Sequence, residues 1–232
     1  MIFGVLIPAA ILGTVALVVV LVVQRARGGP DLSPRALLRL YLYVASLAGI
    51  VVLTIGLASV ANYAVARLAG DGLIYGGSGP GPVVVTAVPT CPPEAVARGC
   101  VNPTPEQLDQ QRTAQKQQTD RRRDEDLIRG ITFTVFGALF WGAHWAARRS
   151  LGEDTPTNTL RRGYLMLGTV VFGLSTVVLL PTGIYQAIAN SLLQTPQNFF
   201  RQGADALGGG IVSLPIWLIY LRLVVTEFRQ SA

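Results

Sequence analysis

Charged residues are scarce in this chain and make up 14% of its 232 residues, whereas a soluble globular domain carries about a quarter. Five stretches hold no charge at all: 1–24, 40–66, 130–147, 163–200 and 206–221. An α-helix needs about 20 apolar residues to cross roughly 30 Å of hydrocarbon, and each stretch meets or approaches that length. Half of the residues are apolar, so little sequence is left for a soluble domain. We expect a membrane protein that resides in the lipid bilayer.

The chain also lacks the common catalytic motifs. No HExxH, P-loop, nucleophile elbow or glycine-rich dinucleotide fingerprint is present, which argues against an enzyme. No histidine accompanies the two cysteines, so a metal site is not expected. The net charge of +6 comes mostly from arginines at the ends of apolar stretches. That placement is typical of topology signals, so we expect no binding to nucleic acid.

The arginines predict how the chain crosses the bilayer, because short cytoplasmic loops are rich in Lys and Arg. The connections after the first and third spans and the C-terminal tail are basic, and between them they hold Arg25, Arg27, Arg35, Arg39, Arg148, Arg149, Arg161, Arg162, Arg222 and Arg229. The connection between the fourth and fifth spans has only Arg201. This alternation predicts five crossings, with the N-terminus outside and the C-terminus in the cytoplasm. The first span, Met1–Val23, is expected to be retained, with a cleaved signal peptide as the alternative.

The remaining connection, 69–126, is long and lies outside the cytoplasm in this topology. It contains Cys91 and Cys100, which favours a disulfide, with two free thiols as the alternative. Thr104 and Pro105 fit the N-cap and first position of a helix, and Gln107 completes a capping box. We expect a polar helix that leads into the third span, with a frayed, partly disordered segment as the alternative.

Two short patterns each occur twice. Arg39-Leu40-Tyr41-Leu42 opens the second span, and Arg162-Gly163-Tyr164-Leu165 opens the fourth span 123 positions later. Trp141 and His144 in the third span correspond to Trp217 and Tyr220 in the fifth, 76 positions later. We predict two related helix pairs in one orientation, a parallel repeat, with chance similarity among apolar sequences as the alternative.

Aromatic and basic residues at the ends of these spans are expected to anchor the protein at the membrane interface, because Trp and Tyr rings favour the headgroup level. The predicted anchors are Arg39, Tyr41, Trp141, Trp145, Arg148, Arg149, Arg162, Tyr164 and Trp217.

The Arg-x-Tyr-Leu entry, followed by the Trp-x-x-His-Trp helix at 141–145, resembles an uncharacterised bacterial membrane domain family. The resemblance covers 37–68 and 131–227. Members of that family often carry duplicated helix pairs, so the resemblance implies a four-helix unit in a bacterial inner membrane. It implies no activity, and Tyr220 departs from the pattern where the first copy has His144.

His144 is the only histidine in the chain and lies in an uncharged segment. Ionisable residues inside a span are costly and often functional. One hypothesis is therefore that His144 ligates a haem or a chlorophyll-type pigment, or responds to pH. The alternative is an ordinary interfacial histidine beside aromatic residues. Pro181 and Pro215 lie inside spans and can kink them, which motivates a third hypothesis, a small-solute transporter or channel.

The expected architecture is an all-α, polytopic membrane bundle. It comprises an N-terminal transmembrane helix (1–24), a first helix pair (37–68 and 127–149), an extracytoplasmic insertion (69–126) and a second helix pair (160–228). The preferred hypothesis is a non-enzymatic accessory, scaffold or assembly subunit that contacts other membrane subunits or a copy of itself through its helices.

Overall fold

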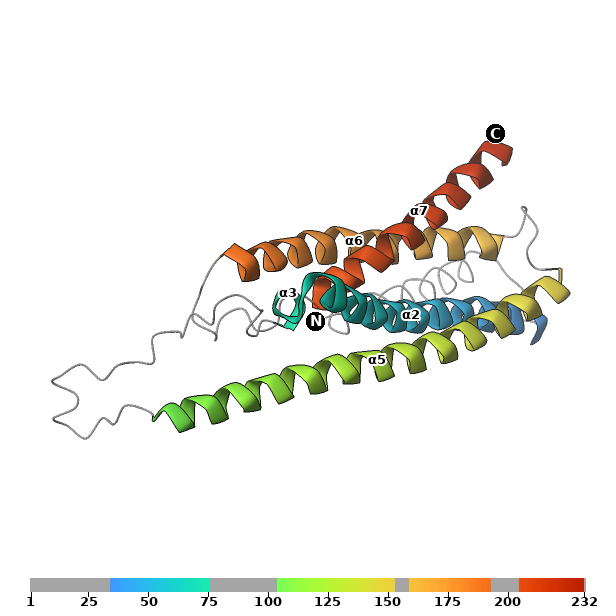
Figure 1. The fold of residues 1–232 in the computed structure, drawn as a ribbon. Coiled ribbons are helices and arrows are strands. Elements are labelled where there is room, and N and C mark those ends of the chain that lie inside the picture. The colour runs from blue at the N-terminus through green and yellow to red at the C-terminus, as the bar shows by residue number, and fades with distance from the viewer. Residues whose placement is uncertain (1–33, 76–103, 153–158, 193–204, 232) are drawn as a thin grey trace, which may run out of the picture.

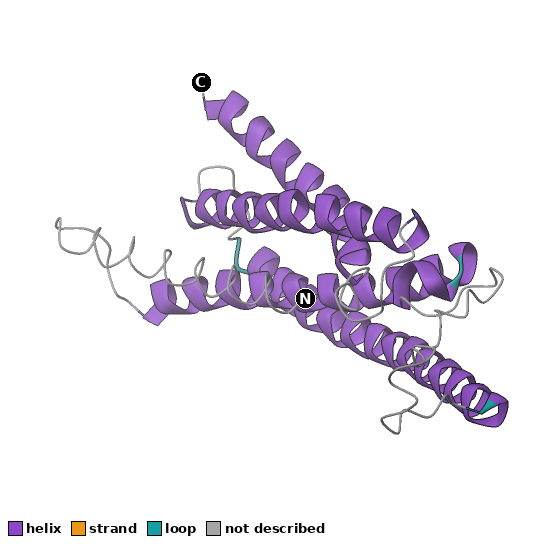
Figure 2. Ribbon diagram, turned by 90° about the vertical axis from the view of Figure 1, so that its left-hand side faces the viewer, coloured by secondary structure: helices purple, strands orange, loops and turns teal. Residues whose placement is uncertain are grey.

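The computed structural model describes residues 34–75, 104–152, 159–192 and 205–231. They form five α-helices: α2 (Pro34–Ala69), α3 (Asp71–Tyr75), α5 (Pro105–Ser150), α6 (Thr159–Leu192) and α7 (Asp205–Ser231). No strand occurs in these ranges (Figure 2). All but the short α3 are long and apolar enough to cross a membrane, as the sequence predicted for a multi-pass bundle. The predicted first span, Met1–Val23, and the Cys91–Cys100 pair lie outside the described residues.

Helix α2 lies at the centre of the arrangement, with α5 on one side and α6 and α7 on the other (Figure 1). The first residues of α2 and α6 meet the last residues of α5 and α7 at one end of the bundle, which we call the arginine end. Among the described residues it carries eight arginines and one acid, Glu227; the arginines are Arg35, Arg39, Arg148, Arg149, Arg161, Arg162, Arg222 and Arg229.

Helices α2 and α5 pack at very short range because a glycine lies at each successive level of their contact. The glycine alternates between the two helices, and a side chain or backbone of the other helix occupies the space. The four levels are Gly49 against Trp141, Gly137 against Leu53, Gly56 against Thr134, and Gly130 against Val60. Small residues at such positions allow helix backbones to approach closely within a membrane.

Helices α6 and α7 form a second pair of the same kind. Gly168 lies under the ring of Tyr220, and Gly173 lies under Trp217. Further along, the hydroxyl of Thr176 donates to that of Ser213 at 3.0 Å. Gly210 and Gly183 then meet the opposite helix.

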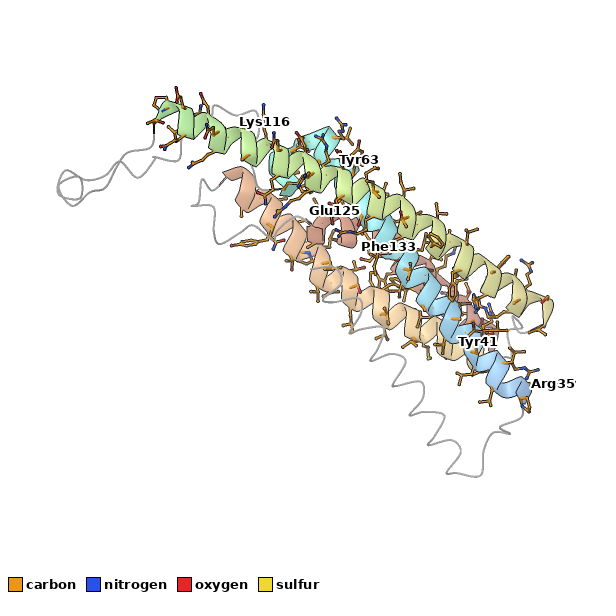
Figure 3. The ribbon with its side chains drawn as sticks, turned by 90° about the horizontal axis from the view of Figure 1, so that it is seen from below. Arg35, Tyr41, Tyr63, Lys116, Glu125 and Phe133 are labelled. Carbon is orange, nitrogen blue, oxygen red and sulfur yellow. The ribbon has the colours of Figure 1, made fainter. Side chains whose placement is uncertain are left out.

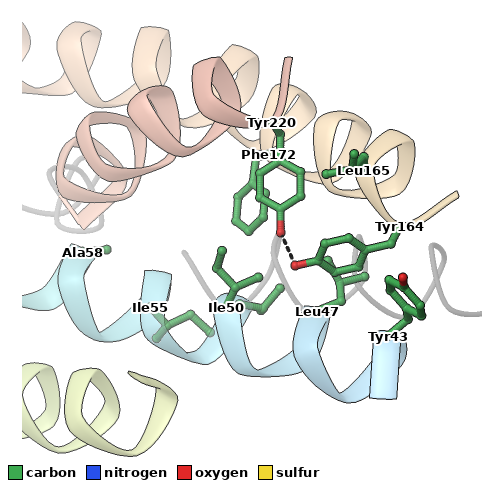
Figure 4. Close-up of a cluster of buried hydrophobic side chains, with 10 residues drawn as sticks. Tyr43, Leu47, Ile50, Ile55, Ala58, Tyr164, Leu165, Phe172 and Tyr220 are labelled. Atoms are coloured by element: carbon green, nitrogen blue, oxygen red, sulfur yellow. Dashed lines mark hydrogen bonds between the residues drawn. The ribbon is translucent and has the colours of Figure 1, made fainter. Parts of the chain in front are cut away.

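The two pairs join through one core cluster, formed where α6 and α7 pack on α2 (Figure 4). Its buried members are Tyr43, Leu47, Ile50, Val51, Ile55, Ala58, Tyr164, Leu165, Phe172 and Tyr220. At the opposite end, the backbone N–H of Gly208 donates to the side-chain oxygen of buried Asn62 at 3.0 Å. This bond satisfies one of the N–H groups that the first turn of α7 leaves without an intrahelical acceptor.

Helix α5 continues for several turns beyond the apolar segment as a polar extension, residues 105–126, which we call the stalk. Thr104 caps its first turn in a capping box with Gln107, and Pro105 occupies the first turn, so the predicted helix start is confirmed. The side chains of the stalk are mostly exposed, and Lys116 points away from the bundle (Figure 3). The polar helix at the end of the insertion and the third span therefore form one 46-residue helix, as expected for a polar helix that leads into this span.

The short helix α3 holds the base of the stalk through an ion pair and a hydrogen bond. Gly70, with φ +99°, turns the chain between α2 and α3, a backbone conformation that glycine adopts without steric cost. Arg123 then forms an ion pair with Asp71 at 3.2 Å, and the hydroxyl of Tyr75 donates to Asp126 at 3.0 Å. No signal in the sequence indicated this five-residue helix.

Candidate functional site

The arginine end holds a buried polar cluster to which all four long helices contribute. Arg148 of α5 is only 3% exposed. Its guanidinium carbon lies 4.7 Å from the centroid of the Tyr43 ring and 4.8 Å from that of Tyr164. A desolvated cation–π contact contributes up to about 2 kcal/mol, so the two rings offset much of the cost of burying this charge. Among the described residues Arg148 has no carboxylate partner.

Tyr164 extends the cluster to α7. Its hydroxyl shares a hydrogen bond with the hydroxyl of Tyr220 (Figure 4), and both side chains are buried. The Tyr164 ring also packs against Tyr43, with centroids 5.6 Å apart. Tyr164 of α6 therefore contacts three other helices: α5 and α2 through its ring, and α7 through its hydroxyl.

Glu227 is the acid of this end and is 5% exposed. Its carboxylate forms an ion pair with Arg161 at 2.6 Å and lies 3.8 Å from Arg162. Breaking a buried ion pair by removing one partner typically costs about 3–5 kcal/mol, because the other charge stays buried. This pairing ties the last turns of α7 to the first turn of α6.

His144 lies on the outer side of the α2–α5 pair and not in the buried cluster. Its Nδ1 is 2.7 Å from the carbonyl oxygen of Phe140. A carbonyl only accepts, so Nδ1 carries a proton and donates, and Nε2 shares a hydrogen bond with the Tyr41 hydroxyl at 3.3 Å. A haem or pigment metal would have to displace the Tyr41 hydroxyl to reach Nε2.

The predicted anchors divide into three groups by exposure. Arg39, Tyr41, Trp145 and Arg149 are exposed at the arginine end, and Arg149 lies over the Trp145 ring at 5.1 Å. Arg148 and Tyr164 differ from the expectation, because both are buried between helices.

Trp141 and Trp217 are half-buried beside Gly49 and Gly173. Both side chains therefore contribute to packing between helices, Trp141 between α5 and α2 and Trp217 between α7 and α6. Arg162 is partly exposed and lies near Glu227.

Sequence reasoning missed Tyr43, Arg161 and Glu227 as members of this cluster. Tyr43 follows Tyr41 by two positions, so the helix turns it to a different face, and that face meets α6 only in the folded bundle. Glu227 is the single acid in the C-terminal 27 residues after Asp205. An isolated acid close to several arginines is the signal that could have indicated a buried ion pair.

The cluster offers cations and hydroxyls but no constellation typical of catalysis. No group of three or more His, Cys, Asp or Glu side chains suited to a metal ion occurs in the described ranges. The contacts of the cluster hold the arginine-rich ends of the four long helices together. The fold and this end define a polytopic helical membrane protein.

Comparison with known proteins adds no relative. No family model, no curated protein and no solved structure matches this chain.

Proposed function

We propose that this chain is a non-enzymatic accessory, scaffold or assembly subunit of a bacterial cytoplasmic membrane, which works through helix contacts with other membrane proteins. In this proposal Met1–Val23 forms a fifth transmembrane helix, and a disulfide joins Cys91 to Cys100. The observation that carries the proposal is the stalk, a polar helix that stands clear of the bundle.

The stalk is unusual because nothing in its own sequence gives it a face to bury. Its residues are polar on all sides, with Leu108 as the one large apolar side chain between Thr104 and Asp126. A helix that is polar all round is stable only through ion pairs along its surface or through contact with something else. It has such pairs, for example Arg112 with Asp109 at 3.1 Å, but each exposed pair contributes only about 0.3–0.5 kcal/mol. A soluble partner domain or partner helix is the contact that fits this polar surface.

The charge distribution supports the proposed orientation. The arginine end carries eight arginines against one acid among the described residues, whereas the stalk end carries seven basic and eight acidic side chains. The positive-inside rule assigns the first of these ends to the cytoplasm. The stalk then stands on the outer side of the membrane, together with the N-terminus.

A deletion that shortens the stalk without disturbing its two ends tests the proposal. Removing residues 108–121 takes out 14 residues, about four helical turns, so the cap at Thr104 and the base at Arg123 keep their relative rotation to within about 40°. We expect the shortened protein to insert and purify like the intact chain, but to lose the membrane proteins that co-purify with it in mild detergent.

A matched control replaces the same 14 residues with a helical Ala-Glu-Lys sequence, which keeps the height of the stalk and removes its side chains. Loss of the co-purifying chains in both variants supports recognition by the side chains. Two results count against the proposal: an intact chain that purifies without any other protein, or a shortened chain that retains every partner.

A further inference from the structure

The two helix pairs make the same contacts at corresponding positions. Adding 123 to a residue of α2 and 76 to a residue of α5 gives its counterpart in the second pair. Contacts in the first pair recur at or within one residue of these counterparts in the second. The corresponding contacts are Tyr41–His144 with Tyr164–Tyr220, Leu53–Gly137 with Thr176–Ser213, Val60–Gly130 with Gly183–Ala206, and Gly49–Trp141 with Gly173–Trp217.

This correspondence supports duplication of one helix pair and lets the surfaces of the two pairs be compared position by position. On α2, the face that receives the second pair is buried: Tyr43, Leu47, Ile50, Ile55 and Ala58. The counterparts on α6 are Met166, Val170, Gly173, Val178 and Pro181. Of these, all but the partly buried Gly173 are exposed. The second pair therefore has its own copy of the receiving face of the first pair, and this copy is exposed.

The second pair packs a different surface against α2, which we call the inserting face. This face is buried in the second pair, and its counterpart in the first pair is exposed. Tyr164 is 7% exposed and Tyr220 is 4% exposed in the core cluster. Their counterparts in the first pair are Tyr41, which is 56% exposed, and His144, which is partly exposed. Ile216 packs against the same cluster, whereas its counterpart Phe140 is exposed. The first pair therefore repeats the inserting face and leaves it open.

The contact between the pairs is thus head to tail. In a two-fold arrangement each pair would use the same surface, and both copies of that surface would be buried. Here each pair uses a different surface, which leaves one inserting face and one receiving face free on the same chain. Repetition of a head-to-tail contact produces a closed ring when its rotation closes.

We propose that a second copy of this chain packs its Tyr41–His144 face against the Met166–Val170 face of the first copy, repeating the contact that joins the two pairs within one chain. Both pairs run in the same direction through the membrane, so the rotation axis lies along the membrane normal and the ring closes in the membrane plane. This inference deepens the proposed function by naming one partner, the chain itself.

The contact inside the chain fixes which residues meet between chains. Tyr164 packs on Tyr43 with ring centroids 5.6 Å apart. The corresponding residues between copies are Tyr41 of one chain and Met166 of the next. Both are exposed in the single chain, so a cysteine at either position leaves the fold of the chain intact.

Site-directed cross-linking in membranes tests the contact. The background carries Cys91→Ser and Cys100→Ser, and two differently tagged chains, one with Tyr41→Cys and one with Met166→Cys, are expressed together. A bifunctional thiol cross-linker is expected to shift the tagged band from 24.7 kDa to about twice that mass. The band should contain both tags and should be absent when either variant is expressed alone.

The matched control pairs Met166→Cys with Ile219→Cys. Ile219 is next to Tyr220 in the chain, so it lies at about the same depth in the bundle as the Tyr164–Tyr220 contact. It is as exposed as Tyr41 and belongs to neither the inserting face nor the receiving face. It is expected to give no dimer band.

Three results overturn the inference. One is a dimer from Tyr41→Cys alone, which means a two-fold contact. Another is an equal yield from the Ile219→Cys control, which means random collision. The third is a single-chain mass for the unmodified protein in mild detergent, which means that lipid or residues 1–24 cover these faces. None of these results affects partner capture by the stalk, so the two proposals fail separately.

Discussion

Replacing Gly137 by alanine tests the close packing of α2 on α5 directly. A methyl group at this position would meet the backbone N of Leu53 and lie 2.6 Å from its Cα, whereas ordinary contact begins at 3.4 Å. The two backbones must therefore separate by at least about 0.8 Å, the difference between these two distances. Overpacking of this kind costs about 1–3 kcal/mol. Alanine also favours a helix over glycine by about 1 kcal/mol, so the net loss is smaller than the overpacking cost.

Gly142 supplies the matched control, because it lies on the same helix and a methyl group there meets nothing within 4 Å. Gly142→Ala gains the same helix propensity without the clash. The difference between the two variants, about 1–3 kcal/mol, therefore isolates the packing. Each kcal/mol corresponds to about 2–4 °C in Tm for a protein of this size, so Gly137→Ala should melt several degrees below Gly142→Ala.

Thermal unfolding in detergent, followed by tryptophan fluorescence, measures this difference. Trp141 reports on the interface because it packs on Gly49, one contact level away from the site of the clash. Equal melting temperatures for the two alanine variants would refute the close approach of α2 and α5 at Leu53.

Three further substitutions test contacts between the helix pairs and within the second pair, each by the same melting measurement. Arg148→Met removes the cation between two tyrosine rings and should lower Tm more than Arg149→Met, because Arg149 is exposed. Equal effects of the two substitutions would contradict the buried cation–π contacts of Arg148. Tyr220→Phe removes a buried hydroxyl–hydroxyl bond and should cost about 1 kcal/mol; an unchanged Tm argues against that bond. Asn62→Leu leaves the Gly208 N–H without its acceptor and should cost about 1–3 kcal/mol; a stabilised variant argues against this cap.

The sequence predicted the elements of this fold better than their contacts. Uncharged stretches and arginine placement located four helices, and the capping box at Thr104 placed the start of α5 correctly. These signals are local, because they depend on length, polarity and a few adjacent residues. The continuity of the stalk with its span is also local, since no proline or glycine breaks the helix between Glu106 and Arg129.

The cluster at the arginine end depends on tertiary packing, and for that reason the sequence misplaced part of it. Arg148 and Arg149 are neighbours with the same chemistry, yet one is buried between Tyr43 and Tyr164 and the other is exposed. Consecutive residues on a helix point about 100° apart, so their fates depend on which side α6 occupies. Nothing in a single sequence fixes that side.

The unbroken helix α5 has a mechanical consequence. Its 46 residues form a rod of about 69 Å, held near its middle where Arg123 meets Asp71. The free arm outside that point is about 27 Å long, and the arm that crosses the membrane to Arg148 is about 38 Å long. Between Gly130 and Trp141 the longer arm is packed against α2 at four levels, so the rod does not turn freely about Arg123. A sideways load on the stalk tip, with a lever arm of about 27 Å, is therefore borne first by the Arg123–Asp71 ion pair and by the close contact of Gly130 with Val60.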